Sequence, residues 1–233
     1  MNRKTSKQHS KMQHSQPVMM VCDIQITNDV ILAPMAGFSD MPYRSICREL
    51  GSGMSYTEFV STDALIRDNP KSLKMLRYNP AERPVSFQIF GNDPVVILEA
   101  AKRIEQLGPD IIDINMGCSV KKVSRRGAGA GLLREPAKIG RIFDMLSRSL
   151  SIPVTGKIRL GWDENSLNYL EVLRAMEENG AQLIAVHGRT KEQAYKGRAN
   201  WDAIAEIKAH ARIPVVGNGD VTCVADIARM KQH

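Results

Sequence analysis

Short apolar runs alternate along this chain with longer segments whose apolar residues recur at helical spacing. A polar–apolar alternation comes first, at residues 23–26. The runs that follow predict strands at residues 30–35, 54–57, 85–90, 111–115, 154–159, 183–187 and 215–217. The intervening segments predict helices at residues 40–50, 61–66, 71–76, from 93 onward, and at 136–150, 167–179, 201–210 and 224–231. Strands that are apolar throughout and separated by helices are typical of a parallel sheet covered by helices.

Local signals fix where several of these helices begin and end. Asp40 can cap the helix that follows it, and Pro42 fits the first turn, where no backbone N–H is needed. Asp93 and Pro94 give the same signal for a later helix, and Gly180 stands where a helix commonly ends. The apolar stripe predicted for the helix after Pro94 comprises Val95, Leu98, Ala101 and Ile104.

The order of these elements favours an α/β fold, a (β/α)8 TIM barrel, over an open doubly wound sheet. About seven strand–helix units are predicted, whereas a closed barrel needs eight strands, so the barrel is expected to be incomplete. We expect residues 21–233 to form one barrel domain, truncated at its C-terminus, and residues 1–20 a disordered basic tail. The glycine-rich residues 127–131 lie in a long loop, which favours a mobile loop over a phosphate site.

Composition adds a few limits to this picture. The 233 residues are 43% hydrophobic and 24% charged, as in an ordinary globular protein, and the formal net charge of +7 indicates an anionic partner. No apolar run approaches the roughly 18 residues of a membrane span. Four scattered cysteines without paired spacing predict neither a metal site nor disulfides and fit a reducing, cytoplasmic location. We expect a monomer.

The stretch with the most candidate chemistry is residues 111–126. Asp113 and Asn115 lie on one face of a predicted strand, and Gly117 permits a turn that presents Cys118 just beyond it. Four basic residues follow the cysteine within eight positions: Lys121, Lys122, Arg125 and Arg126. A polar strand end, a presented thiol and a basic loop fit a redox or acid–base site for an anionic substrate; a free cysteine in a solvated basic loop is the alternative.

Other predicted strands also end in polar residues, as chemistry on a barrel requires. Taken singly, these residues have structural alternatives, such as an ion pair between Lys157 and Asp113 or a hydrogen-bonded structural role for His187. Together they favour a site, because a hydrophobic core does not need them. A cation and an amide at one edge, with a small apolar segment nearby, fit a flavin ring. The thiol of Cys118 can supply a proton at neutral pH, although cations beside it would lower its pKa.

Five motifs stand in order at residues 33–37 (APMAG), 115–118 (NMGC), 157–161 (KIRLG), 187–190 (HGRT) and 217–220 (GNGD). Together they resemble the tRNA-dihydrouridine synthase family, its bacterial branch in particular, over about residues 24–231. The resemblance implies an FMN-dependent barrel enzyme that reduces the 5,6 double bond of selected uridines in tRNA, with NADPH as the hydride source.

The resemblance also implies roles for individual residues. Cys118 would be the general acid that protonates uracil C5. The residues implied to bind the flavin are Pro34, Met35, Ala36, Gln88, Lys157, His187, Asn218, Gly219 and Asp220. The residues implied to meet the extruded base or the tRNA phosphates are Asn115, Lys121, Lys122, Arg125, Arg126, Arg159, Arg189 and Lys191.

Two departures from the family pattern change what is expected. Ser119 stands where the family usually has proline, which would loosen the turn that carries Cys118. The family's last barrel strand, with a Gly-Arg pair for the FMN phosphate, and its C-terminal tRNA-binding domain are missing, so weak FMN binding and poor tRNA binding are expected. Two other functions fit the pattern: a flavin barrel reductase of a small molecule, and an inactive barrel that merely binds flavin or RNA.

Overall fold

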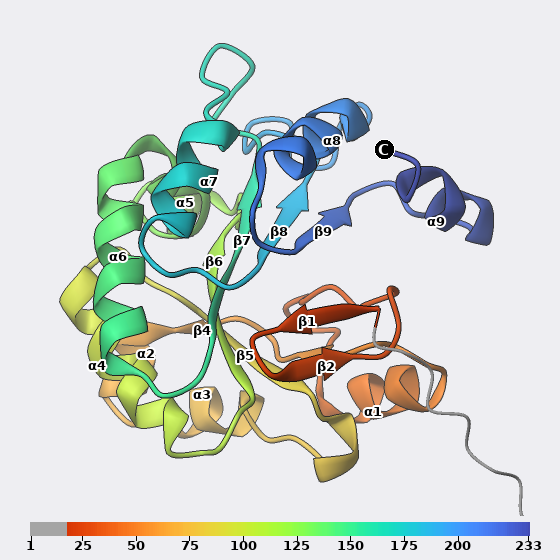
Figure 1. Cartoon of the computed structure of the whole chain (residues 1–233). Helices are drawn as coiled ribbons and strands as arrows, with labels where there is room; N and C mark the ends of the chain where they lie inside the picture. The colour runs from red at the N-terminus through yellow and green to blue at the C-terminus, as the bar shows by residue number, and fades with distance from the viewer. Residues whose placement is uncertain (1–17) are drawn as a thin grey trace, which may run out of the picture.

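The computed structural model describes residues 18–233, which form a curled, mostly parallel sheet with helices on its outer side (Figure 1). The strands are β1 (Met19–Val21), β2 (Ile24–Ile26), β3 (Ser55–Tyr56), β4 (Val60–Ser61), β5 (Val85–Phe90), β6 (Ile111–Met116), β7 (Val154–Arg159), β8 (Ile184–His187) and β9 (Val215–Asn218). The helices are α1 (Met41–Glu49), α2 (Thr62–Ile66), α3 (Pro70–Met75), α4 (Pro94–Glu105), α5 (Lys121–Ser124), α6 (Pro136–Ser149), α7 (Tyr169–Glu177), α8 (Trp201–His210) and α9 (Val224–Met230), with 3₁₀-helices η1 (Pro80–Glu82) and η2 (Gly129–Arg134).

The sheet confirms an incomplete α/β barrel. Its strands follow the order β3-β5-β6-β7-β8-β9, each paired in parallel with the next, and β4 extends the contact with β5. From β5 onward a helix returns the chain to the start of the next strand, as parallel pairing requires. The antiparallel pair β1–β2 lies apart from this sheet.

Side chains alternate between the two faces of the sheet and form two cores. On β5, Phe87 and Ile89 point outward and pack with buried residues of the helices. The inner core is smaller: Ile111 of β6 packs there with Val21 and Ile26 of the hairpin. The hairpin therefore covers one end of the barrel interior with apolar side chains, and the polar inward residues lie toward the other end of the strands.

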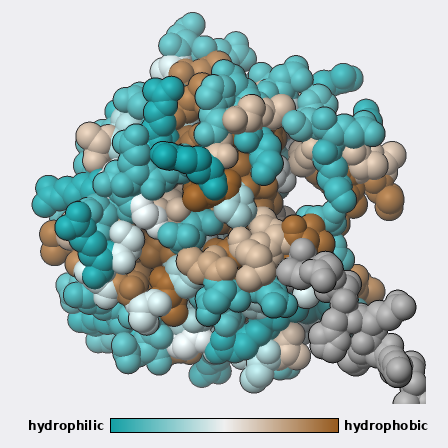
Figure 2. Space-filling view, viewed as in Figure 1, coloured by the Kyte–Doolittle hydropathy of each residue, from teal (hydrophilic) through white to brown (hydrophobic). Residues whose placement is uncertain are grey.

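Residues 30–35, predicted as a strand, form none. Few backbone contacts hold this segment: the carbonyl of Val30 accepts from Gly53 N at 2.8 Å, and Leu32 N donates to Ser52 Oγ at 3.1 Å. A cavity of about 700 Å³, lined by Ile31, Val216 and other largely apolar residues, lies between this segment and β9. Figure 2 shows an opening on this side of the molecule. A strand needs a continuous ladder of hydrogen bonds, and the described residues supply none here.

Two further predictions are corrected. Strand β1 begins at Met19, inside the segment expected to be a disordered tail, while residues 1–17 lie outside the described part of the chain. The glycine-rich segment predicted to be a mobile loop is largely the buried 3₁₀-helix η2. Its backbone packs closely: a Cβ on Gly131 would lie 2.5 Å from the carbonyl oxygen of Ser124, so only glycine fits.

The helix ends agree closely with the sequence signals, whereas the buried face of α4 agrees less well with the predicted apolar stripe. Asp40 caps α1 by accepting a hydrogen bond from Tyr43 N at 3.1 Å. In α4 the buried residues include Ala101 and Ile104, as predicted, together with Ile97 and Ala100, whereas Val95 is exposed. Val95 lies in the first turn, beyond the surface that the neighbouring helices cover. Among residues 18–233, no helix combines the length and the apolar character needed to cross a membrane.

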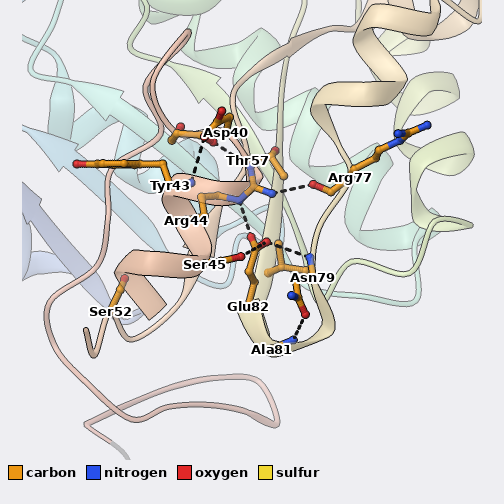
Figure 3. A network of polar contacts seen from close by, with 12 residues as sticks. Asp40, Tyr43, Arg44, Ser45, Ser52, Thr57, Arg77, Asn79, Ala81 and Glu82 are labelled. Atoms are coloured by element: carbon orange, nitrogen blue, oxygen red, sulfur yellow. Dashed lines mark hydrogen bonds and ion pairs between the residues drawn. The ribbon is translucent and has the colours of Figure 1, made fainter. Parts of the chain in front are cut away.

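A fully buried ion pair joins α1 to η1 (Figure 3). Arg44 Nε donates to Glu82 Oε2 at 2.7 Å, and neither side chain is exposed. The remaining guanidinium donors reach the carbonyls of Ser39 and Arg77, and Asn79 N donates to Glu82 Oε1 at 2.9 Å. Every charged atom of the pair therefore has a partner, which buried charges require.

We predict that Arg44→Met lowers the free energy of unfolding by about 3–5 kcal/mol, because it leaves the Glu82 carboxylate buried without its counter-ion. Urea denaturation of the purified chain measures the loss. Arg103→Met is the matched control: its ion pair with Glu99 is solvent-exposed, so its loss should cost less than about 1 kcal/mol. Equal losses in the two variants would contradict the prediction.

Candidate active site

The polar inward residues of five neighbouring strands lie side by side because the strands are in register. Gln88 of β5 pairs with Asp113 of β6, and Asp113 with Thr155 of β7. One layer further along, Asn115 pairs with Lys157, and at the ends of the last strands His187 pairs with Asn218. The structure thus brings Gln88, Asn115, Lys157, His187 and Asn218, all predicted site residues, to one end of the barrel interior. We call this end the mouth.

Asp113 is the most buried acid of this group and is satisfied by neutral donors. Gln88 Nε2 donates to its Oδ2 at 2.7 Å, and Thr155 Oγ1 donates to its Oδ1 at 2.6 Å. Burial raises the pKa of Asp113 to about 6, although these two hydrogen bonds and the charge of Lys157 act in the opposite direction. The ion pair with Lys157, considered as a structural alternative, does not form: Lys157 Nζ instead donates to Asn218 Oδ1 at 3.1 Å.

Lys157 is a half-buried cation at the centre of the mouth. Burial lowers its pKa to about 8; the charge of Arg159 adds to this effect, and Asp113 opposes it. The ammonium group is therefore mostly charged at neutral pH. One of its three N–H groups is used by Asn218, which leaves donors for a ligand in the mouth.

Four hydrogen bonds to backbone groups fix the turn that carries Cys118. Asn115 Oδ1 accepts from Gly117 N at 3.1 Å and from Cys118 N at 2.9 Å. Arg159 Nε donates to the Gly117 carbonyl at 2.8 Å, and Ala130 N of η2 donates to the Cys118 carbonyl at 3.1 Å. The turn is thus held from three sides, so its position does not require a proline after the cysteine.

The half-buried thiol of Cys118 is in its protonated form at neutral pH. Burial raises its pKa, while a backbone hydrogen bond at Val120 and the charge of Arg159 act against this effect. The prediction that Lys121 and Lys122 lower this pKa is not supported, because both side chains are exposed and water screens their charges.

His187 lies among cations and is neutral. Burial lowers its pKa to about 3, and the charges of Arg159, Lys157 and Arg189 add to this effect. Arg189 Nη1 lies 3.3 Å from His187 Nε2, and Arg189 Nη2 contacts both carboxylate oxygens of Asp220, at 2.7 and 2.9 Å.

The turn after β9 packs closely against this imidazole. A Cβ on Gly219 would lie 2.8 Å from His187 Cδ2, and the residue has a φ of +109°, so the position requires glycine. The carboxylate of Asp220 accepts from Ala199 N at 2.7 Å, and this contact and Arg189 lower its pKa. The turn is therefore part of the wall of the mouth.

The cations predicted to meet RNA fall into two groups. Arg159, Arg189 and Lys191 are buried, and Arg159 Nη1 is bound to the carbonyls of Thr190 and Ala194. This burial argues against direct phosphate contacts by these three residues. The cations in and just after α5 are exposed, and we call them the basic cluster: Lys121, Lys122, Arg125 and Arg126.

Two parts of the mouth complete the geometry. Pro34, Met35 and Ala36 are placed beside the end of β3, because the adjacent Gly37 N donates to Glu58 Oε1 at 2.6 Å. Tyr195, which we did not predict, is 81% exposed, and the Arg159 guanidinium lies 5.8 Å from its ring centroid. The sequence signal that could have identified Tyr195 is an aromatic residue between two lysines, Lys191 and Lys196, in the loop after a predicted strand.

The mouth therefore combines a protonated thiol, a cation, a neutral imidazole and three amide side chains. Such a set can bind a planar polar ring and transfer a proton. Within the described residues, no group of three or more His, Cys, Asp or Glu side chains could hold a metal ion.

Comparisons with known proteins show which family the sequence matches. Residues 31–233 match the family model described as dihydrouridine synthase. The chain is 44% identical over 204 residues to tRNA-dihydrouridine synthase B of Pseudomonas aeruginosa, covering 88% of this chain and 61% of that protein. It is 40% identical over 220 residues to a probable tRNA-dihydrouridine synthase of Treponema pallidum, covering 90% of this chain and 65% of the relative.

A solved structure supports the fold. Histamine dehydrogenase from Rhizobium sp. 4-9 superposes with a TM-score of 0.65 at 15% identity, over 89% of this chain and 42% of that one. The chain thus spans less than two thirds of the length of these proteins.

We predict that the His187 imidazole remains neutral from pH 8 down to about pH 4.5, because its pKa is about 3. Between about pH 6.5 and 3 the unfolded chain binds a proton here that the folded chain does not, so this group lowers stability as the pH falls through that window. Imidazole NMR, assigned with His187→Gln, measures the titration. A midpoint above pH 5 would contradict the prediction.

Proposed function

We propose, from the premise that this chain belongs to the dihydrouridine synthase family, that it is the FMN-binding barrel of an enzyme that reduces uridine in tRNA to dihydrouridine. The observation that carries this proposal is the position of Cys118. Its turn follows β6 at the mouth, next to the layer that contains Lys157. A proton donor and a cation meeting at one barrel mouth fit a reduction that ends in protonation.

The groups around the mouth fit FMN. Lys157 is a mostly charged donor with N–H groups to spare, and a cation beside a flavin stabilises its reduced, anionic form. The Gln88 amide donates one N–H to Asp113 and accepts from Asn115 with one lone pair of its oxygen. One N–H group and one oxygen lone pair therefore have no hydrogen-bond partner among the described residues. Residues 34–36 offer small and apolar surface at the same end of the sheet. When bound, FMN supplies the hydride that adds to C6 of the uracil, and NADPH is the proposed source of reducing equivalents.

The proton that completes the reduction comes from Cys118 in this proposal. Its Sγ carries a proton at neutral pH because burial raises the thiol pKa. Transfer of this proton to uracil C5 forms the C5–H bond and leaves a thiolate. The positive charge of the nearby Arg159 stabilises this negative charge. Asn115 and Arg159 keep the turn in place while the proton moves.

The basic cluster and Tyr195 support an RNA substrate. A uridine inside folded tRNA must be extruded to reach the mouth, and exposed cations bind the flanking phosphates. Tyr195 presents an exposed ring at the mouth, and aromatic rings stack on unpaired bases. A reductase of a small molecule would leave four exposed cations close to Cys118 unexplained. We further propose a monomeric, cytoplasmic protein.

We predict that Cys118→Ala retains the visible absorption of bound flavin but loses at least about 99% of tRNA reduction, because a general acid contributes about 10²–10⁴-fold. Dihydrouridine formation on tRNA, followed by mass spectrometry, measures the loss. Cys47→Ala, in α1, is the control and should match the parent. Unchanged turnover in Cys118→Ala would remove this residue from the mechanism.

A second prediction concerns the basic cluster. Lys121→Gln/Lys122→Gln should weaken tRNA binding and reduce the slope of log affinity against log salt by about 2, since each phosphate contact contributes about one unit. Binding titrations at several salt concentrations measure the slope. Lys71→Gln/Lys74→Gln removes the same charge from exposed positions of α3 and should leave the slope unchanged. Equal slopes in the two double variants would exclude the cluster as an RNA contact.

A further inference from the structure

A chain of side-chain hydrogen bonds runs through the barrel interior from Asp113 to the cysteine turn. Gln88 Nε2 donates to Asp113 Oδ2 at 2.7 Å, and Asn115 Nδ2 donates to Gln88 Oε1 at 2.8 Å. Asn115 Oδ1 then accepts from the backbone N–H groups of Gly117 and Cys118, at 3.1 and 2.9 Å. The three side chains are buried, so water does not readily replace a missing bond.

The direction of this chain is fixed at both ends. Backbone N–H groups can only donate, so Asn115 must present its oxygen to the turn and its NH₂ group to Gln88. Gln88 must then turn its oxygen toward Asn115 and its NH₂ group toward Asp113. The chain is satisfied only if an acceptor lies at its far end, and the carboxylate of Asp113 is that acceptor.

The carboxylate is itself held in one orientation. Thr155 Oγ1 donates to Asp113 Oδ1 at 2.6 Å, which leaves Oδ2 facing Gln88. Asp113 makes no hydrogen bond to the turn itself; the side-chain hydrogen-bonded path from it to Cys118 runs through the two amides. Ser119, which follows the cysteine, does not restrict the backbone as proline would, so the hydrogen bonds from Asn115, Arg159 and Ala130 hold the turn.

We propose that Asp113 is a positioning residue for Cys118, acting through Gln88 and Asn115 to fix the turn that presents the thiol. The importance of this role for catalysis rests on the proposed function of Cys118 as proton donor. The positioning itself is a property of the protein without substrate or cofactor, so it can be measured separately.

The test uses an exchange of charge between two neighbours. Gln88→Glu alone places two carboxylates in contact and removes the donor that Asp113 requires. Adding Asp113→Asn restores the chain: the amide of position 113 donates to the new carboxylate, which still accepts from Asn115. Asp113→Asn alone also keeps an acceptor for Gln88, with Thr155 accepting from the new amide, whereas Asp113→Leu removes the acceptor and keeps the number and branching of the side-chain heavy atoms.

The readout is the rate of alkylation of Cys118 by iodoacetamide across pH, followed at the Cys118 peptide by mass spectrometry in the 233-residue chain. We expect Gln88→Glu and Asp113→Leu to change this rate about tenfold or more, or to shift its pH midpoint. Asp113→Asn and the double variant should stay within about threefold of the parent. Ser86→Ala, a buried change in the same strand, is the control for general damage and should not change the rate.

Thermal unfolding of each variant separates positioning from stability. If Gln88→Glu or Asp113→Leu does not fold, the two variants that keep the hydrogen-bond chain, Asp113→Asn and the double variant, still decide the question. A tenfold change in either of these, with an unchanged melting temperature, would overturn the proposal, as would parent-like alkylation in a folded Gln88→Glu variant. Because alkylation needs neither RNA nor flavin, the result is independent of whether the chain forms dihydrouridine.

Discussion

The burial of the Asp113 carboxylate imposes the strongest constraint on this structure. A charge removed from water costs several kcal/mol unless hydrogen bonds replace its hydration. The donors come from the two neighbouring strands, Gln88 on one side and Thr155 on the other, which stand opposite Asp113 in the parallel register. A slip of one residue would turn these donors to the helix-covered face. The carboxylate and the register of β5, β6 and β7 therefore depend on each other.

The same requirement explains the buried cations around the mouth. Arg159 donates to carbonyls of the turn after β6 and of the loop after β8, and Arg189 binds the carbonyls of Lys196 and Gly197 as well as Asp220. Irregular loops expose carbonyl groups, and guanidinium groups can satisfy several of them at once. These arginines thus hold the loops that form the mouth, and their charges help to keep His187 neutral. The basic cluster in and just after α5, by contrast, presents its charge to solvent.

The polar layer does not depend on closure of the barrel. Its members come from β5, β6, β7, β8 and β9, which pair consecutively. The hydrogen bonds among them therefore need no strand across the opening. The cavity beside β9 is lined mainly by apolar residues, among them Ile31 and Val216, which pack against the inner core, and Asn218 also lines it. Asn218, which accepts from Lys157, therefore lies where the polar layer meets the apolar opening.

The sequence by itself determined the strands and the longer helices from β5 to α9, but not α5 or η2, because continuous apolar runs, helix caps and a C-terminal glycine are local signals. It also identified Cys118, Lys157, His187 and Asn218 as strand-end residues. It did not identify the partner of Lys157, the burial of η2 or of Arg159 and Arg189, or the missing strand at residues 30–35. Each of these depends on what lies opposite in space. Hydrogen-bond partners and desolvation come from residues far apart in the chain, so only the tertiary structure decides which polar groups are buried and how they are satisfied.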